Sequence, residues 1–267
     1  MRTRQFIFII FTCAYFLSYF YRLANAVIAP DLTAALNLTP SQLGLTTSIF
    51  FATFAAAQIP LGIGLDRWGP RWVTPSLMFV GVIGSLVFAQ ANSFFLLSVS
   101  RGLIGIGMAG ILMGSLKAFS QWFPANRFAT ISGLLVGIGS TGSLFAATPL
   151  AWLNQEIGWR SVFTIMAGVT FLVAAIIMTF GRNTPPGVAW PEQTKGQGGV
   201  GQVLLDSRFW RLAPVTFFGS GTGLAFQGLW AGPYLFDVYK LSEIDGGNSL
   251  LWTGVGAPLG FISSGWL

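Results

Sequence analysis

The sequence predicts an all-α integral membrane protein, and three observations carry that prediction. Of the 267 residues, 53% are hydrophobic and only 8% are charged, whereas soluble domains carry about 25% charged residues. The apolar residues gather into stretches of about 20 residues, which is the length that a helix needs to cross a bilayer. Short segments rich in charge, Gly and Pro separate these stretches. Together, these features exclude an ordinary soluble domain.

Eight apolar stretches are candidate spanning helices. Arg2 and Arg4 precede the first stretch, as in a signal peptide, but the run continues to about Ala29. That is too long for the apolar segment of a signal peptide, so we interpret it as the first spanning helix. The eight predicted helices cover residues 6–29, 42–63, 73–91, 94–118, 128–153, 159–180, 209–236 and 247–267.

The longest break between helices predicts a linker between two bundles. It covers about 181–207 and contains Pro185-Pro186 and a glycine-rich run at 196–201, a composition typical of flexible connections. The predicted organisation is an N-terminal six-helix bundle at 1–180, a cytoplasmic linker at 181–208, and two helices of a second bundle at 209–267. Because the chain stops inside an apolar run, we expect it to be an N-terminal fragment.

The distribution of basic residues predicts the orientation. With the N-terminus in the cytoplasm, ten Lys and Arg lie on the inner side, and only Arg160 and Lys240 lie on the outer side. Arg22 and Arg101 lie within helices. An excess of basic residues is typical of cytoplasmic segments. We therefore expect a multi-pass protein of the plasma membrane, in bacteria the inner membrane, with its N-terminus in the cytoplasm.

The segment 62–71 reads GIGLDRWGPR and separates the second and third predicted helices. Such a short connection favours glycine for the turn, and its charges are too costly to bury in lipid. The segment resembles the signature G-x-L-x-D-R-x-G-R-R of the major facilitator superfamily. The matching residues are Gly62, Asp66, Arg67, Gly69 and Arg71. Gly64 stands where Leu is usual, and Pro70 stands where a basic residue is usual.

The resemblance implies a fold of two six-helix halves and a secondary transporter that works by alternating access. It implies that the signature residues act as a gate between the halves on the cytoplasmic side. The N-terminal region is more weakly similar to bacterial organic-anion and sugar-acid permeases, which implies a small substrate such as an organic anion or a similar metabolite. Two alternatives remain open: a sensor or scaffold without transport activity on the same fold, and an exporter of neutral or amphipathic compounds.

An enzyme is not expected. The chain has no His, a single Cys13 and no paired carboxylates or metal-ligand spacing, so we expect neither a cofactor nor a metal site. The basic residues are scattered between apolar segments rather than clustered, which disfavours nucleic acid as a partner. The predicted partners are the bilayer, a small-molecule substrate and an unidentified coupling ion.

A polar stripe on the first helix is the predicted substrate site. Tyr19, Arg22 and Asn25 follow one another at a spacing of three residues, which places them on one face of a helix. A charge deep in a spanning helix usually faces the bundle interior or a water-filled cavity. Arg22 is therefore predicted to bind an anionic group of the substrate. The alternative is a structural arginine that bonds helix carbonyls or extends outward.

Arg101 and Gln227 are the other predicted substrate contacts. Arg101 begins a run of small residues in the fourth helix, which resembles a second signature of the superfamily. If the first and fourth helices both line the cavity, as the resemblance implies, Arg22 and Arg101 at similar depth would form a cationic pocket. Arg101 could instead serve helix packing alone. Gln227 lies on one face of the seventh helix and could equally bond a neighbouring helix. No Asp or Glu lies deep in the eight helices, so this segment gives no support to proton coupling.

Overall fold

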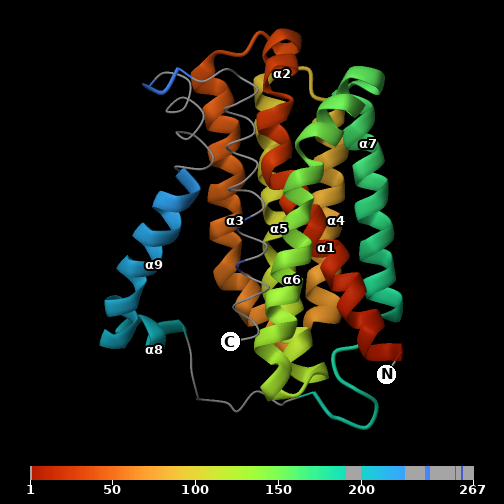
Figure 1. The fold of residues 1–267 in the computed structure, drawn as a ribbon, viewed down its shortest axis with the longest axis vertical. Helices are drawn as coiled ribbons and strands as arrows, with labels where there is room; N and C mark the ends of the chain where they lie inside the picture. The colour runs from red at the N-terminus through yellow and green to blue at the C-terminus, as the bar shows by residue number, and fades with distance from the viewer. Residues whose placement is uncertain (1, 191–199, 226–237, 241–255, 257–259, 261–267) are drawn as a thin grey trace. The chain divides into compact units, whose positions relative to one another are not determined.

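The computed structural model describes residues 2–190, 200–225, 238–240, 256 and 260. In these residues the long regular elements are all helices (Figure 1). The helices are α1 (Arg2–Val27), α2 (Ala29–Leu36), α3 (Pro40–Trp68), α4 (Pro70–Ala89), α5 (Phe94–Trp122), α6 (Ala125–Phe145), α7 (Thr148–Phe180), α8 (Val200–Leu205) and α9 (Ser207–Ala225). The helices α1 to α7 form one compact unit, and α8 and α9 belong to a second unit.

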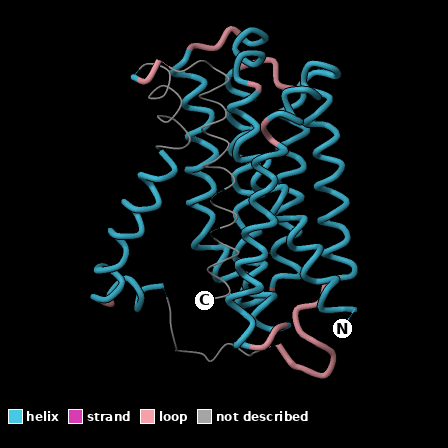
Figure 2. The backbone as a smooth tube through the Cα atoms, in the orientation of Figure 1, coloured by secondary structure: helices cyan, strands magenta, loops and turns pink. Residues whose placement is uncertain are grey.

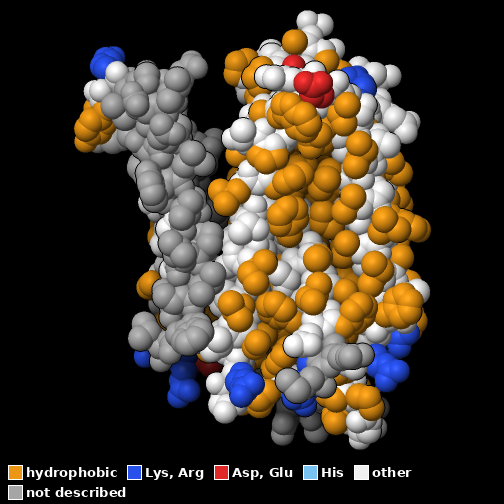
Figure 3. All heavy atoms as spheres, turned by 45° about the vertical axis from the view of Figure 1, so that its right-hand side comes forward, with side chains coloured by type: hydrophobic (Ala, Val, Ile, Leu, Met, Phe, Trp, Pro, Cys, Tyr) orange, Lys and Arg blue, Asp and Glu red, His pale blue; other side chains and the backbone are white. Residues whose placement is uncertain are grey.

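Six helices of the first unit are long and apolar enough to cross a membrane, namely α1, α3, α4, α5, α6 and α7. They confirm the first six predicted spans and the all-α membrane fold class. Many of their large apolar side chains are exposed, among them Ile59, Phe95 and Leu172. Figure 3 shows hydrophobic side chains spread along the visible face of the bundle, with Lys and Arg gathered mainly at one end. Such a surface fits contact with lipid.

The connection at 62–71 is much shorter than predicted. Helix α3 continues to Trp68 and α4 begins at Pro70, so Gly69 alone, at φ 78°, separates the two helices. The prediction of a decapeptide loop was therefore wrong, and Gly62 lies within α3. A helix satisfies its own backbone polar groups, so it can continue through polar residues until a residue forces the turn.

The boundary between α6 and α7 also differs from the prediction of one helix over 128–153. Helix α6 ends at Phe145, and α7 begins at Thr148 with Pro149 in its first turn. Proline is favoured in the first turn of a helix because it lacks the N–H that would remain unpaired there. Within α7, Gly158 adopts φ 76° and interrupts the helical backbone. The predicted break before residue 159 thus appears as a kink.

Small residues allow the helices of the first unit to approach closely. Helix α1 packs against α5, α6 and α7, while α4 packs against α5 and α7, and Figure 2 shows the helices running side by side. At the α4–α5 contact, a Cβ on Gly107 would meet the backbone of Gly81. Spanning helices often associate through such contacts, because close backbone approach increases van der Waals packing.

The predicted linker and second bundle are described only in part. Residues 181–190 form a folded segment without helix, and α8 lies inside the predicted linker. Helix α9 begins at Ser207, close to the predicted start of the seventh span at 209. The rest of that span, including Gln227, lies outside the described residues. The same is true of most of the predicted eighth helix.

Candidate functional site

Arg22 lies half-buried on α1 between two aromatic rings. Its guanidinium carbon is 5.0 Å from the ring centroid of Tyr19 on the same helix and 5.3 Å from that of Phe54 on α3. Tyr19 in turn contacts the ring of Tyr15 edge to face, with centroids 5.1 Å apart. A cation over an aromatic face is stabilised by the ring quadrupole. These contacts restrict the orientation of the guanidinium plane.

The Arg22 guanidinium makes no hydrogen bond or ion pair with any residue that the structure describes. Its Nε is buried and has no hydrogen-bond partner. An arginine in a spanning segment is costly unless it is paired or meets water. The aromatic contacts offset only part of that cost, so Arg22 retains unused capacity to bind an anion.

Asn25 lies one turn further along α1 and is only 2% exposed. Its Nδ2 donates a 2.9 Å hydrogen bond to Thr47 Oγ1 on α3, while its Oδ1 is buried without a partner. Two residues of the predicted stripe, Arg22 and Asn25, therefore contact α3, and the Asn25 hydrogen bond joins the two helices beside Arg22.

Arg101 occupies a different environment from Arg22. It is 0% exposed, and its Nη1 donates a 3.1 Å hydrogen bond to the carbonyl oxygen of Tyr21. Its guanidinium carbon is 4.6 Å from the ring centroid of Phe50, and Phe50 stacks on Phe54 with centroids 6.1 Å apart. The structure therefore links the two arginines through a pair of stacked rings. It does not bring Arg101 to an open surface, so this placement gives no support to a shared cationic pocket.

Tyr21 joins three helices at a neutral polar cluster. Its hydroxyl donates to Ser85 Oγ on α4 at 3.0 Å and lies 3.2 Å from Thr170 Oγ1 on α7. Ser85 donates onward to the carbonyl of Phe163 at 2.8 Å. Tyr21 is fully buried, so its side chain points into the bundle, away from the face on which Arg22 meets Phe54.

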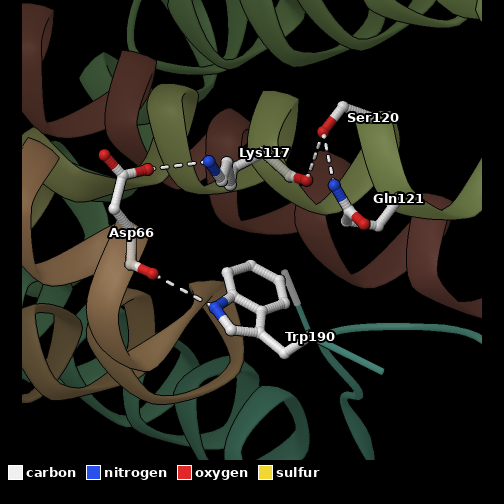
Figure 4. Close-up of polar contacts among 5 residues, drawn as sticks. All are labelled: Asp66, Lys117, Ser120, Gln121 and Trp190. Atoms are coloured by element: carbon white, nitrogen blue, oxygen red, sulfur yellow. Dashed lines mark hydrogen bonds and ion pairs between the residues drawn. The ribbon is translucent and has the colours of Figure 1, made fainter. Parts of the chain in front are cut away.

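Asp66 of the signature pairs with a lysine that the sequence did not single out as its partner. Figure 4 shows the 2.7 Å ion pair between Asp66 Oδ1 and Lys117 Nζ on α5. Trp190 Nε1 donates to the carbonyl oxygen of Asp66 at 3.1 Å, and its ring centroid lies 5.9 Å from Lys117 Nζ. Beside Lys117, Ser120 donates to its carbonyl oxygen at 2.8 Å. Both charges of the ion pair are partly exposed.

The two signature arginines have different contacts. Arg71 Nε donates to the carbonyl oxygen of Met178 on α7 at 3.2 Å, and its guanidinium carbon lies 5.0 Å from the Trp72 ring. Arg67 is exposed, with its guanidinium carbon 5.4 Å from the Trp68 ring. Arg71 therefore joins the α3–α4 turn to α7, whereas Arg67 remains at the surface.

A groove of about 470 Å³ runs beside the ion pair, between α3 and α5. Its lining residues are Gln58, Gly62, Leu65, Asp66, Met113, Leu116, Lys117 and Ser120. The groove thus combines apolar side chains with one pair of opposite charges. Gln58 on α3 donates a 3.3 Å hydrogen bond to the carbonyl of Ala109 on α5, which joins the two helices beside the groove.

Several site residues were not predicted. Phe54 carried no sequence signal, because one phenylalanine among 25 is unremarkable. Lys117 was counted among the basic residues of the predicted inner side. That placement put it on the same side of the membrane as Asp66, which was a usable signal for their pairing. Asn183, whose side chain bonds the Arg71 N–H and the Trp68 carbonyl, lies with Trp190 in the predicted flexible linker. A polar amide and an indole in such a linker gave no reason to expect contacts.

The chain resembles known membrane transporters along most of its length. The family model described as Major Facilitator Superfamily matches residues 11–267. Among solved structures, the chain is similar to the transporter FucP in its outward conformation, with a TM-score of 0.77 and 18% identity over 99% of this chain and 71% of that one. At this identity, the likeness shows the fold alone.

Curated relatives are also transporters by name. The chain is 28% identical over 185 residues to the probable sulfoacetate transporter SauU of Cupriavidus necator, covering 69% of this chain and 43% of the relative. It is 26% identical over 260 residues to a putative tartrate transporter of Agrobacterium vitis (87% and 57%), and 25% identical over 246 residues to the hexuronate transporter of Escherichia coli strain K12 (85% and 57%). The chain thus spans about half the length of these relatives.

These findings agree with the six apolar spans and the signature at the α3–α4 turn. They also agree with the expectation that the chain is no enzyme. The chain belongs to the Major Facilitator Superfamily.

Proposed function

We propose that the chain contributes to a secondary transporter that moves a small organic anion across the membrane by alternating access. The observation that carries this proposal is the half-buried guanidinium of Arg22, which meets Tyr19 and Phe54 but no acidic side chain or carbonyl among the described residues. A planar guanidinium binds a carboxylate through two parallel hydrogen bonds. An anionic substrate would supply the partner that Arg22 lacks.

In this proposal the other site residues have distinct roles. Asn25 holds α1 against α3 through Thr47, and Tyr19 and Phe54 orient the Arg22 guanidinium. Arg101 acts inside the bundle, where it bonds the backbone next to Arg22. Gln227 remains a predicted contact from the second unit. The relatives named for sulfoacetate, tartrate and hexuronate, all organic anions, support the same substrate class.

The proposed orientation places the N-terminus and the α3–α4 turn in the cytoplasm. The positive-inside bias of the sequence supports it. In that orientation, the ion pair of Asp66 and Lys117 forms one side of a cytoplasmic gate whose other side comes from the second half of the protein. Alternating access is then a rocking of two halves about the substrate site.

Substrate uptake into proteoliposomes tests this proposal. The complete protein containing this chain is reconstituted and offered radiolabelled sulfoacetate, tartrate, a hexuronate, a neutral hexose and a dipeptide, with and without a pH gradient. We expect saturable uptake of at least one anion and none of the neutral sugar. Preferential uptake of the neutral compound would contradict an anion site, and the absence of any uptake would favour a sensor or scaffold.

A further inference from the structure

The segment that follows α7 folds back onto the turn between α3 and α4. We call residues 181–190 the strap. Within it, Thr184 Oγ1 donates to the carbonyl of Val188 at 2.6 Å, and Val188 N–H donates to the carbonyl of Pro185 at 3.1 Å. This turn, with Gly187 at φ 84°, reverses the chain. Residues at both ends of the strap therefore contact the same part of the bundle.

Several backbone N–H and carbonyl groups at the α3–α4 turn have no hydrogen-bond partner within these two helices. The last carbonyls and the first N–H groups of any helix lack intrahelical partners. Gly69 is the single residue between the helices and has no side chain with which to cap α4. Pro70 stands four residues after Asp66, and because proline has no N–H, the Asp66 carbonyl cannot receive the usual helical hydrogen bond.

The strap satisfies three of these groups. Asn183 Nδ2 donates to the carbonyl of Trp68 at 3.1 Å, and Asn183 Oδ1 accepts from the N–H of Arg71 at 2.9 Å. Trp190 Nε1 donates to the carbonyl of Asp66 at 3.1 Å. One amide thus caps the end of α3 and the start of α4, and one indole supplies the donor that Pro70 removes.

The fit of Asn183 depends on the glycine in the turn. A Cβ added to Gly69 would collide with the side-chain amide of Asn183. The strap is also held from α5, because Trp122 Nε1 donates to the carbonyl of Arg182 at 3.0 Å. Trp122 is itself buried. These contacts reach α3, α4 and α5, so the strap is an integral part of this end of the bundle.

We propose that Asn183 is a positioning residue for the signature turn, and that the strap fixes the backbone from which Asp66 reaches Lys117. Trp190 is the last described residue before residues 191–199, and it bonds Asp66 directly. The strap thereby joins the signature turn to the segment that leads to the second unit. This capping role of Asn183 does not depend on the identity of any substrate.

Hydrogen–deuterium exchange tests the inference in the detergent-solubilised protein without substrate. In Asn183→Ala, we expect the Arg71 amide to exchange about fivefold faster or more, which corresponds to the loss of one net hydrogen bond. Peptides from the middle of α3 and α4 should exchange at the wild-type rate. The matched control is Asn154→Ala, which removes a single hydrogen bond to Asp31 and should leave the Arg71 amide unchanged.

Two further variants separate capping from general stability. Asn183→Asp keeps an acceptor for the Arg71 N–H, so it should restore slow exchange at that amide. Asn183→Leu keeps similar volume without hydrogen-bonding groups, so it should exchange as fast as Asn183→Ala, and it replaces that variant if Asn183→Ala does not fold. Slow exchange at Arg71 in Asn183→Ala or Asn183→Leu, or equal acceleration along all of α3 and α4, would overturn the proposal. None of these results depends on whether the protein transports an anion.

Discussion

Arg101 Nη1 donates a 3.1 Å hydrogen bond to the carbonyl oxygen of Tyr21, the residue that directly precedes Arg22. A second connection between the two arginines runs through aromatic rings. Arg101 lies over Phe50, Phe50 stacks on Phe54, and Phe54 lies against Arg22. Arg101, which is fully buried, therefore bonds the backbone beside Arg22. It also packs against the same pair of stacked rings that Arg22 contacts.

Arg101→Ala should destabilise the protein more than Arg22→Ala. Arg101 is 0% exposed and packs against Phe50, so its truncation leaves a cavity that costs on the order of 2 kcal/mol or more. Arg22 is half-buried, and its truncation removes less packing. The measurement is the unfolding temperature of both variants in the same detergent. A larger decrease for Arg22→Ala would contradict the assigned environments.

Gly69→Ala should lower the unfolding temperature, whereas Gly62→Ala should not. Gly69 has φ 78°, and a Cβ there would collide with Asn183. With ψ 166°, Gly69 lies in a backbone region that essentially only glycine adopts, so the strain alone costs about 1–3 kcal/mol. Gly62 is the matched control because it is helical and a Cβ there meets nothing within 4 Å. Alanine at Gly62 should be neutral, or stabilising by up to about 1 kcal/mol. Equal effects of the two variants would be inconsistent with the observed turn.

Asp66→Asn should impair transport by the complete protein without blocking membrane insertion. The ion pair with Lys117 is partly exposed, so its own contribution to stability should be only about 0.2–1 kcal/mol. An effect on transport would act instead through the balance between the two states of the gate, on the order of 1–3 kcal/mol. Uptake by Asp66→Asn and Lys117→Gln, singly and together, measures the coupling. Wild-type uptake in Asp66→Asn would exclude Asp66 from the gate.

Tyr21→Phe should reduce stability by about 1 kcal/mol. The variant keeps the buried ring but removes the hydroxyl that meets Ser85 and Thr170. The effect stays small because Ser85 still donates to Phe163 and Thr170 still donates to Met166. Thermal unfolding of the purified variant checks this. A loss comparable with that of Arg101→Ala would mean that the hydroxyl has a larger role than these contacts indicate.

The six spans of the first unit could be predicted from the sequence, because a bilayer demands long apolar stretches and few charges. The ends of the helices could not. Helix α3 extends to Trp68 because polar residues can stay helical beyond the apolar region, and only Gly69 ends it. Pro149 was predicted inside a helix, although it lies in the first turn of α7. The apolar composition of a segment predicts that it lies in the bilayer, but it does not predict the residue at which the backbone turns.

The candidate site was predictable where one helix carries it. The spacing of Tyr19, Arg22 and Asn25 placed them on one face of α1, and the structure shows Arg22 and Asn25 in contact with α3. Contacts between distant segments, such as Asp66 with Lys117 and Asn183 with the α3–α4 turn, depend on tertiary packing. No local pattern encodes them.

The most direct test of the account is the uptake of an organic anion by Arg22 variants of the complete protein in proteoliposomes. Loss of charge-assisted hydrogen bonds to a carboxylate should weaken binding by about 10- to 100-fold, so Arg22→Ala should abolish measurable uptake at low substrate concentration. Arg22→Lys should retain part of it, since the charge remains but the bidentate geometry is lost. The matched control is Arg127→Ala, which removes an exposed arginine and should leave uptake unchanged. Wild-type uptake and affinity in Arg22→Ala would remove Arg22 from the substrate site and contradict the account.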